Sequence, residues 1–535
     1  ISGIEVTFTR KNGETEESVI VKKAANTTVE RNGGLNLGDF FVYEISTADE
    51  LLAWNKAVTK WTVWDVVTLT KTIDCTTIKS EDWTPNEFKG VFDGQGNTID
   101  NLKIEKAGHA SFFKKLQDAT VENVVFGTGC SFTATGATGG YIYASSLAGE
   151  VRGGTTLTDI VNKGAVNIAA EATGGTAANY IGGISAFVKS DAVSKMTDCK
   201  NEGPVTASAA PEAHLYCGGV VGSADAYTSK FPDSALTLTG CENHGLVQYN
   251  GTNTNNKNLY IAGISALVCN SKVTFSSCKN LGSIQSNADA SHSGQTNIGG
   301  IIALDGGNLL GVLENCVNGS LTDSDAGTLV NNSDATGQLN MGGFIATMTS
   351  ASNVTGFKNY GTVNNKGAVT NWTVLGGVVG YVKTGKAVVS TCENHGQVLN
   401  EKSSGRVSAG GVVGFIDASD ASVNSCTNAA EIKNTGAASN GVSLGGVVGR
   451  IQAKQNGDNT ISDCDNTGAV TFAATSVKDQ AMMSAVGGVI GVHAGPVYGS
   501  GDNRYHKSAK VTISGCNNTG AVTKNGAGSY NFAVG

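Results

Sequence analysis

The chain has 535 residues, 72 glycines, only five prolines, a formal net charge of -8 and a charged fraction of 15%. Globular domains usually carry about a quarter of charged residues, so neutral side chains must cover much of this surface. The acidic balance and the lack of a basic run argue against nucleic acid and anionic membranes as partners. No apolar run is long enough to span a bilayer. Because the chain begins at Ile1, we expect any signal peptide or lipid anchor to precede it.

Residues 1–44 contain short alternations of apolar and polar residues, as at 4–8 and 19–21. A period of two is typical of a β-strand. We therefore expect residues 1–44 to be an N-terminal β segment, either the edge of a cap or the tail of a preceding domain.

The next feature is a capping box at 47–50, which leads into an amphipathic pattern. In such a box the Thr and Glu side chains bond to each other's backbone amides and start a helix. We expect a helix from about Ala48 to Thr59 that covers the open end of the array following it, since an unpaired edge needs cover. Its apolar surface would consist of Trp54, Trp61 and Trp64. Residues 45–130 would form this helix and the first coils, with strands at 66–74, 88–99 and 121–126.

From residue 131 onward one unit recurs ten times. Its first half has the form Gly-Gly-Val-Val-Gly, as at 445–449, and its second half has the form Cys-x-Asn-x-Gly-x-Val, as at 464–470. The second halves, each with the three residues before the Cys position, lie at 157–166, 196–205, 238–247, 275–284, 313–321, 354–363, 389–398, 423–432, 461–470 and 513–522. The first half begins again at 531–535, so we expect the array of 131–535 to continue further.

The spacing within a unit predicts its fold. Val447, Gly449 and Ile451 alternate as in a strand with one apolar face, whereas Ile461 lies three residues before Cys464, so the chain must bend there. Each unit then supplies about three short strands and is too short for crossover helices. Its strands can pair only with the next unit, about 4.8 Å away. We expect an all-β, right-handed parallel β-helix of roughly twelve coils with an N-terminal capping helix.

An asparagine occurs at one position of all ten units. Because an amide donates and accepts, such a column can bond along the stack and satisfy backbone groups at a bend. A catalytic asparagine would be needed only once, so we interpret the column as a structural ladder. It comprises Asn162, Asn201, Asn243, Asn280, Asn318, Asn359, Asn394, Asn428, Asn466 and Asn518.

Eight of the twelve cysteines share another column, which also accepts Ile160 and Phe357. Those two residues can neither form a disulfide nor bind a metal, so we expect inward, reduced thiols that act as small apolar side chains. The eight are Cys199, Cys241, Cys278, Cys316, Cys392, Cys426, Cys464 and Cys516.

The stretch Phe88-Lys89-Gly90-Val91-Phe92-Asp93-Gly94-Gln95-Gly96-Asn97-Thr98-Ile99, the helix before it and the Gly-Gly-Val-Val-Gly units resemble the GLUG-type β-helix repeats of bacterial cell-surface proteins. The resemblance covers roughly residues 45–535. It implies an adhesin-like, secreted or surface-exposed protein, although such repeats also accompany some immunoglobulin-cleaving metallopeptidases. The peptidase signature His-Glu-x-x-His is absent, because no His in the chain is followed by Glu.

Loops between units are where we expect binding. The longest lie at 220–241, 321–342 and 489–516. The last gathers aromatic rings and hydrogen-bond donors that suit a sugar or an acidic partner, and its alternative interpretation is a solvated insertion. The candidate binding residues are Tyr498, Arg504, Tyr505, His506 and Lys507.

Catalysis is not expected. A lyase or hydrolase on this fold needs clustered carboxylates or bases, whereas Asp198 and Asp463 share a register far apart along the stack, and the pair Glu242 and His244 recurs only four units later. We expect no cofactor and no metal, since no phosphate-binding loop follows the glycines and no calcium repeat is present. We expect an adhesin or rigid scaffold outside the cell whose partner is a host or bacterial surface glycan or protein. The alternative is a carbohydrate-active β-helix enzyme.

Overall fold

The computed structural model describes the chain except for residues 1–3, 13–14, 24–41, 58–64, 139, 174–177, 209–212, 252–255, 270–271, 289–291, 308–311, 324, 384, 453–456, 475, 477–483, 495–496, 499–504, 507–509, 526–531 and 535. For residues 4–12, 15–23, 138, 171–173, 312, 494, 497–498, 505–506 and 532–534 only the backbone is described. No helix within the described ranges is long and apolar enough to cross a membrane.

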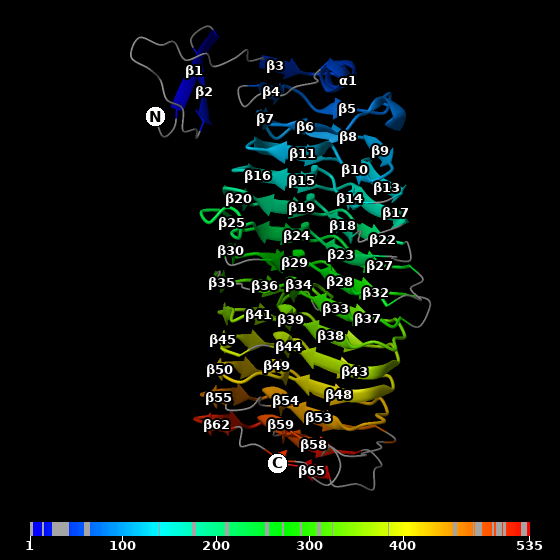
Figure 1. Ribbon diagram of the computed structural model, residues 1–535, viewed down its shortest axis with the longest axis vertical. Coiled ribbons are helices and arrows are strands. Elements are labelled where there is room, and N and C mark those ends of the chain that lie inside the picture. Colours follow the sequence, from blue (N-terminus) through cyan, green and yellow to red (C-terminus); the bar gives the residue numbers. More distant parts are fainter. Residues whose placement is uncertain are drawn as a thin grey trace.

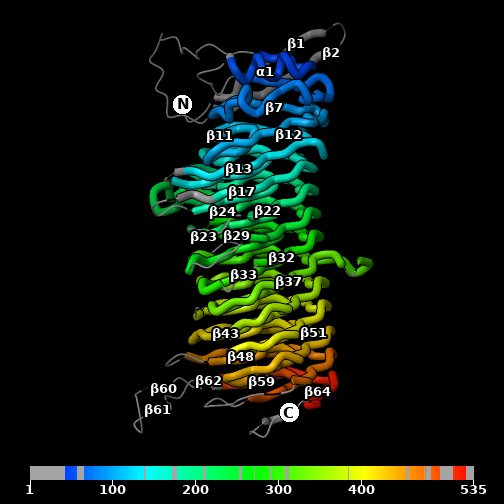
Figure 2. The backbone as a smooth tube through the Cα atoms, turned by 90° about the vertical axis from the view of Figure 1, so that its right-hand side faces the viewer, coloured from blue at the N-terminus to red at the C-terminus, as the bar shows by residue number. Residues whose placement is uncertain are grey.

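The protein is a right-handed parallel β-helix, as the sequence predicts. Its coils stack into one elongated body, with the chain advancing from one end to the other (Figure 1, Figure 2). Each coil crosses four long parallel sheets, which we number I to IV in the order in which a repeat unit such as 178–207 crosses them. Sheets I, II and IV contain twelve strands each, which agrees with the expected number of coils.

The strands of sheet I are β10 (His109–Ala110), β14 (Ile142–Ala144), β18 (Ala178–Gly182), β23 (His214–Gly218), β28 (Leu259–Ala262), β33 (Thr296–Gly299), β38 (Leu339–Gly342), β43 (Val369–Gly376), β48 (Ser404–Gly410), β53 (Val442–Gly445), β58 (Ser484–Gly487) and β65 (Phe532–Val534). Those of sheet II are β6 (Asn86–Phe88), β11 (Phe113–Gln117), β15 (Ala148–Arg152), β19 (Ser185–Ser190), β24 (Val221–Ala226), β29 (Ser265–Cys269), β34 (Ile302–Asp305), β39 (Ile345–Met348), β44 (Val379–Val382), β49 (Val413–Ile416), β54 (Val448–Gln452) and β59 (Ile490–Ala494).

Sheet III has two ladders, which join in the long strands β12 (Thr120–Phe126) and β16 (Thr156–Asn162). The first ladder also contains β3 (Val42–Ile45), β4 (Val66–Leu69), β7 (Val91–Asp93), β20 (Val193–Thr197), β25 (Ala235–Thr239), β30 (Val273–Ser276), β35 (Val312–Glu314), β40 (Asn353–Thr355), β45 (Val388–Ser390), β50 (Ser422–Asn424), β55 (Asp458–Ser462) and β62 (Lys510–Ser514). The second contains β5 (Ile73–Asp74), β8 (Thr98–Asp100), β21 (Lys200–Asn201), β26 (Glu242–Asn243), β31 (Lys279–Asn280), β36 (Val317–Asn318), β41 (Lys358–Asn359), β46 (Glu393–Asn394), β51 (Thr427–Asn428), β56 (Asp465–Asn466) and β63 (Asn517–Asn518).

The strands of sheet IV are β9 (Lys103–Lys106), β13 (Ser131–Thr138), β17 (Ala165–Thr173), β22 (Val205–Ala207), β27 (Val247–Tyr249), β32 (Ile284–Ser286), β37 (Leu329–Asn331), β42 (Val363–Asn365), β47 (Val398–Asn400), β52 (Ile432–Asn434), β57 (Val470–Phe472) and β64 (Val522–Lys524). A typical coil therefore has five short strands, such as β18, β19, β20, β21 and β22, and not the three that the spacing suggested. The extra breaks occur at the glycine pair and at the bend within sheet III.

The bend within sheet III is made by residues in the left-handed region. Their φ angles lie between 51° and 66°, which favours Gly, Asn and Asp. The predicted bend between Ile461 and Cys464 is confirmed, since Asp463 has this conformation. The column comprises Asn123, Asp159, Asp198, Gly240, Ser277, Asn315, Gly356, Thr391, Ser425, Asp463 and Gly515. Asp198 and Asp463 therefore share a register because they form turns.

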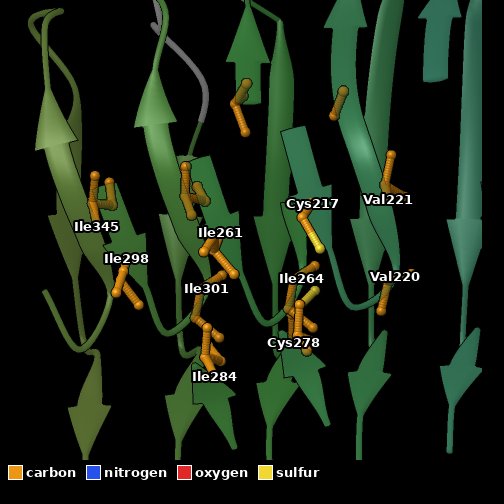
Figure 3. Packing of buried hydrophobic residues seen from close by; sticks show 14 of the residues in the cluster. Cys217, Val220, Val221, Ile261, Ile264, Cys278, Ile284, Ile298, Ile301 and Ile345 are labelled. Atoms are coloured by element: carbon orange, nitrogen blue, oxygen red, sulfur yellow. The ribbon is translucent and has the colours of Figure 1, made fainter. Parts of the chain in front are cut away.

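The core consists of apolar columns that continue from coil to coil. Cys217, Ile261 and Ile298 are register partners in sheet I, and all three are fully buried in the same cluster (Figure 3). The twelve cysteines are free thiols. Of the eight in the predicted column, seven are fully buried and Cys516 is partly exposed, and Ile160 and Phe357 are buried with them. The expectation that these side chains point inward is confirmed.

The ten asparagines of the repeat form a hydrogen-bonded ladder. In each described step the Nδ2 atom of one asparagine donates to the Oδ1 atom of the next, as from Asn359 to Asn394 at 2.8 Å and from Asn394 to Asn428 at 2.7 Å. In most coils the Nδ2 atom also donates to the backbone carbonyl two residues further on, as from Asn394 to Gly396. A second ladder, which was not predicted from the sequence, links Asn331, Asn365, Asn400 and Asn434 in sheet IV at 2.6–2.8 Å.

The helix α1 (Ala48–Ala57) begins at the predicted capping box. The Glu50 amide donates to Thr47 Oγ1 at 3.2 Å, and the Thr47 amide donates to Glu50 Oε2 at 3.1 Å. Trp54 is buried with Phe88, Phe92, Phe112 and Phe113, whose ring centroids lie 5.6–6.3 Å from its own. Trp61 and Trp64 lie outside the described residues. The helix lies at the N-terminal end of the stack (Figure 1).

Two strand pairs lie outside the four sheets. β1 (Ile4–Asn12) and β2 (Thr15–Lys23) form an antiparallel pair within the predicted N-terminal segment. Since β3 already pairs with β4, the solenoid begins at Val42. The second pair, β60 (Val497–Tyr498) and β61 (Tyr505–His506), lies in the longest predicted loop.

Candidate binding site

The predicted loop at 489–516 is only partly described. Backbone pairing places Val497 opposite His506 and Tyr498 opposite Tyr505, which brings two of the candidate tyrosines together on a short hairpin. Arg504 and Lys507 lie outside the described residues. The loop therefore stays a predicted binding site.

The other two predicted loops contain strands of the sheets. The stretch 220–241 contains β24 and β25, which leaves a turn at 227–234, and the stretch 321–342 contains β37 and β38. The unit predicted at 313–321 is wrong at its end, since Leu329 pairs with Ile284 and Val363, whereas Leu321 is 78% exposed. In the turn, the Tyr227 ring contacts Phe231, and Lys189 Nζ lies 3.7 Å from the centroid of Tyr227.

A concave corner between sheets I and II offers a more extensive surface. The chain reverses sharply at each glycine pair: a Cβ atom on Gly182 would lie 2.1 Å from the Ser185 carbonyl oxygen. The outward side chains of the two sheets therefore converge, and the Tyr180 and Phe187 rings lie 4.9 Å apart. We call this corner the seam. Sheets I and II run side by side along the molecule (Figure 1).

The seam explains why one position of the ten repeat units, that of Gly449, holds only Ala or Gly. Val447, Gly449 and Ile451 were predicted to face one way, but the core contains Val447, Val448 and Ile451. In two earlier coils the register position of Gly449 is occupied by Ala266 and Ala303. These two residues pack against Tyr260 outside the main core. A Cβ on Gly449 would lie 2.6 Å from the Ala409 carbonyl oxygen. The expectation of strict alternation is wrong here because this position lies in the corner of the seam.

Four tyrosines stack on one another along the seam. Tyr143, Tyr180, Tyr216 and Tyr260 are consecutive register partners in β14, β18, β23 and β28. Their ring centroids are 5.6, 5.0 and 5.0 Å apart, and successive planes differ by 10°, 12° and 4°. Tyr143 and Tyr260 are 6% and 7% exposed, whereas Tyr180 and Tyr216 are more exposed. We call these four residues the tyrosine ladder.

The ladder presents ring edges and hydroxyl groups. Asn258 Nδ2 donates to the Tyr260 hydroxyl at 2.9 Å, while no described residue hydrogen-bonds to the hydroxyls of Tyr143, Tyr180 and Tyr216. Burial raises the pKa of these three phenols above its usual value of 10.0. The hydroxyls are therefore neutral at physiological pH, and each can donate and accept a hydrogen bond.

Of the charged groups near the ladder, Arg152 is paired with Glu150, whereas Lys114 near His109 and Lys257 near His214 have no ion pair with a described residue. Arg152 Nη2 lies 2.7 Å from Glu150 Oε2, and the same guanidinium lies over the Phe187 ring at 5.4 Å. Lys189 and Asp225 are register partners on neighbouring strands of sheet II. This part of the seam is therefore aromatic and polar, and the four rungs themselves carry no charge.

A second aromatic group lies further along the same seam. The Trp372 and Phe415 ring centroids are 5.0 Å apart, and Tyr381 stacks on Phe415 at 5.1 Å. The guanidinium of Arg406 lies 4.2 Å from the Trp372 centroid, and the buried Arg450 lies 5.9 Å from it. We call these five residues the tryptophan cluster. The Tyr381 hydroxyl also donates to Asp417 Oδ2 at 3.1 Å.

The tyrosine ladder and the tryptophan cluster are separated by a polar stretch. Asn297 and Asn340 occupy the tyrosine position in the next two coils, and Asn340 Nδ2 donates to Asn297 Oδ1 at 3.0 Å. Thr347 of sheet II donates to Asn297 Oδ1 at 2.7 Å. The seam is thus continuous, but its chemistry changes along the molecule.

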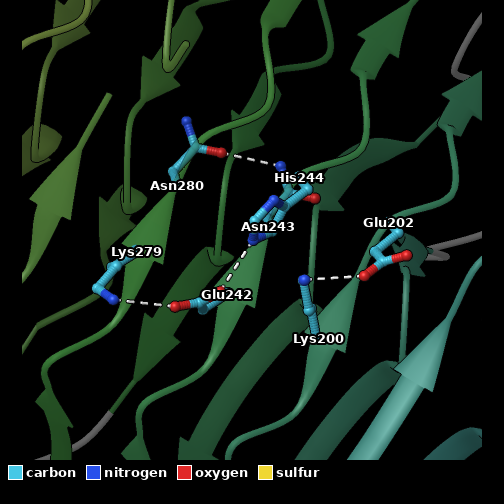
Figure 4. Close-up of polar contacts among 7 residues, drawn as sticks. All are labelled: Lys200, Glu202, Glu242, Asn243, His244, Lys279 and Asn280. Atoms are coloured by element: carbon cyan, nitrogen blue, oxygen red, sulfur yellow. Dashed lines mark hydrogen bonds and ion pairs between the residues drawn. The ribbon is translucent and has the colours of Figure 1, made fainter. Parts of the chain in front are cut away.

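The Glu and His pairs form an ion-pair network on sheet III (Figure 4). His244 Nε2 lies 2.9 Å from Glu242 Oε2, and Lys279 Nζ lies 3.1 Å from Glu242 Oε1. The same arrangement recurs with His395 and Glu393, and there hydrogen bonds from His395 and Lys358 lower the pKa of Glu393. Each Glu and His thus meet within a coil. Their side chains are 26–37% exposed, and exposed pairs contribute little to stability.

Carboxylates elsewhere do not gather into a metal site. No group of three or more His, Cys, Asp or Glu that could hold a metal occurs among the described residues. Asp305 is fully buried at the end of β34, where Gly307, Ser350 and Ser352 hydrogen-bond to its carboxylate. Burial raises the pKa of Asp305. It lies in the register of the core residues Val268 and Met348 and does not face the seam.

The sequence carries a signal for the tyrosine ladder that a search for unusual loops overlooks. The four tyrosines belong to four consecutive units, and each lies two positions before the glycine pair of its unit. In these units the pair is Ser-Ser, Gly-Gly, Gly-Gly and Ala-Gly. A residue so close to the sharp turn has to lie at the corner. The tryptophan cluster has a similar signal, because Tyr381, Phe415 and Arg450 each follow the Gly-Gly-Val-Val-Gly motif of consecutive units.

No protein-family model matches the chain, and no curated protein matches its sequence. Among solved structures, the chain is similar to "a putative immunoglobulin A1 protease from Bacteroides ovatus", with 13% sequence identity and a TM-score of 0.28. The match covers 82% of this chain and 84% of that chain. The resemblance to GLUG-type repeats therefore rests on the motifs alone.

Proposed function

We propose that the protein is a secreted or cell-surface bacterial β-solenoid of the GLUG-repeat type, which acts without catalysis as a rigid adhesive scaffold and binds its ligand along the seam. The observation that carries the proposal is the tyrosine ladder, which continues through four consecutive coils. Tyr180 and Tyr216 at its centre are partly exposed, and exposed apolar patches often mark interaction sites.

The scaffold supports binding because its stacked coils hold the aromatic rings in place. Each tyrosine is fixed by backbone pairing to the coils on both sides and by stacking on its neighbours. A surface that is already ordered loses little conformational entropy when it binds. A rod of coils also extends this surface in one direction, which suits a partner that is itself long.

A carbohydrate-active enzyme is the second candidate, and one observation favours it. Asp417 accepts a hydrogen bond from Tyr381, and Tyr381 stacks on Phe415, over whose ring the guanidinium of Arg450 lies at 6.0 Å. A carboxylate and a phenol in contact could exchange a proton with a substrate. Hydrolases usually use two carboxylates about the scissile bond, so Asp417 would need a second acid from outside the tryptophan cluster.

Two assays on the same preparation test the proposal. The full chain is measured for adhesion to bacterial and host cells and for release of sugar ends from a panel of polysaccharides. We expect adhesion without any release of sugar ends. Release that is lost in the Asp417→Asn variant would establish the enzyme, and a protein that neither adheres to cells nor binds any polysaccharide would reject the scaffold.

A further inference from the structure

We infer that the tyrosine ladder binds a single chain of a neutral polysaccharide, which lies along the long axis of the solenoid with its sugar rings against successive tyrosines. This inference names the ligand class of the seam and rests on the function proposed above.

The hydrogen-bonding groups of the ladder match those of a sugar. The phenols of Tyr143, Tyr180 and Tyr216 remain protonated, and no described residue uses their hydroxyls. Sugar hydroxyls likewise donate and accept. A row of groups that can do both accepts a chain of hydroxyls in either orientation, which a row of carboxylates or ammonium groups could not do.

The aromatic rings beside the ladder match the apolar C–H groups of a sugar ring. Tyr141 is 48% exposed, and its ring lies 6.0 Å from that of Tyr143 and 6.1 Å from that of Tyr180. Phe187 contacts Tyr180 from sheet II. The C–H groups of a pyranose can pack against these rings while its hydroxyls reach the phenols. Binding sites for small molecules combine apolar walls with a few fixed polar groups in this way.

Charge argues against a polyanion. Glu150 neutralises Arg152, and Lys189 lies on the Tyr227 ring beside Asp225 of the neighbouring strand. Recognition of phosphate or of acidic sugars needs cationic groups free to pair with each repeat of the polymer. The ladder itself carries no charge, so its ligand should carry none.

The spacing argues against a polypeptide lying along the axis. The rungs repeat every 5.0–5.6 Å, whereas side chains on one face of an extended peptide repeat every 6.4–6.8 Å, roughly. A peptide would lose register with the rungs within about three coils. A pyranose ring is similar in length to the coil spacing, so each sugar can meet the next tyrosine.

Calorimetric titration of the full chain with linear β-1,4-linked gluco-, manno- and xylo-oligosaccharides of about two to eight units tests the inference. We expect at least one series to bind, with an affinity that rises with length and levels off at about four units, because the ladder has four rungs. Linked contacts gain affinity only while each new unit reaches a site.

The Tyr180→Phe/Tyr216→Phe double variant tests the hydroxyls and keeps the stacked rings. Losing two hydrogen bonds should weaken binding roughly 5- to 100-fold. Tyr360→Phe is the matched control, since Tyr360 is a half-exposed tyrosine stacked on His395 on sheet III, away from the seam. This control should bind as the wild type does, and near-ultraviolet circular dichroism should show the same fold for all three proteins.

The inference is overturned if no oligosaccharide of the three series binds, or if the double variant binds as tightly as the Tyr360→Phe control. If the wild type adheres to cells and the double variant adheres equally well, the scaffold function stands and the assignment of its ligand to the ladder fails. If the wild type binds oligosaccharides but does not adhere to cells, the ligand class stands and the adhesive function fails.

Discussion

At the scale of single residues, the solenoid depends on columns of small polar groups that repeat in every coil. The asparagine ladder is the best example: each amide holds the backbone of its own turn and the amide of the next coil. Because Asn394 is fully buried, water cannot replace any of these bonds. A buried polar group that loses its partner costs about 1–3 kcal/mol.

Replacing Asn394 by Ala should therefore lower the free energy of unfolding by roughly 2–5 kcal/mol, since the Gly396 carbonyl and Asn428 Oδ1 each lose a donor. The measurement is urea unfolding followed by circular dichroism. Asn424→Ala is the control, because Asn424 is half-buried and its Nδ2 donates only to Ser422 within the same coil at 3.1 Å. Equal unfolding midpoints for the two variants would show that the ladder adds no stability.

At the scale of elements, the glycine pair decides the shape of each coil. It ends the strand of sheet I, turns the chain, and allows sheet II to begin close to it. The second glycine has a further role, since a Cβ on Gly377 would lie 2.1 Å from the Gly411 carbonyl oxygen and 2.2 Å from Asn394 Cγ. The turn and the asparagine ladder therefore share one crowded space.

Gly377→Ala should destabilise the protein by about 1–3 kcal/mol or more, because backbone on the next coil must move to admit the methyl group. Gly154→Ala provides the comparison: its Cβ would approach no atom closer than 3.6 Å, and its stability should stay within about 0.5 kcal/mol of the wild type. Thermal unfolding of both variants measures this difference. A Gly377→Ala protein as stable as Gly154→Ala would mean that the turn has room.

The elements also show how far the sequence could lead. Periodicity and unit length were enough to predict parallel strands, the bend at Asp463 and the capping box at Thr47, because each follows from local chemistry. The seam was missed because two sheets must first be folded against each other before Tyr180 and Phe187 meet. Strict alternation failed at the Gly449 position for the same reason. The loop at 489–516 was predicted to bind a partner because it interrupts the sequence repeat, whereas the four tyrosines of the ladder occupy a regular position within the repeat.

At the scale of the whole molecule, every coil adds one layer to the core, and each repeat unit adds one asparagine to the ten-membered ladder. Stability in such an array is a sum of coils and their contacts with neighbours. Local changes in one coil therefore leave distant coils folded, and the surface between them stays in register. This property suits a molecule that presents one long face to a partner, and it makes the position of that face the central question.

Hydroxyl-radical footprinting of the full chain, free and bound to the cells or polysaccharide to which it adheres, locates the binding face most directly. The method works whatever the chemical identity of the ligand. Binding along the seam predicts reduced modification of Tyr141, Tyr180 and Phe187, with Tyr360 modified equally in both states. Protection confined to residues 495–508, with Tyr141 and Tyr180 modified as in the free protein, would contradict binding along the seam and move the site to the loop.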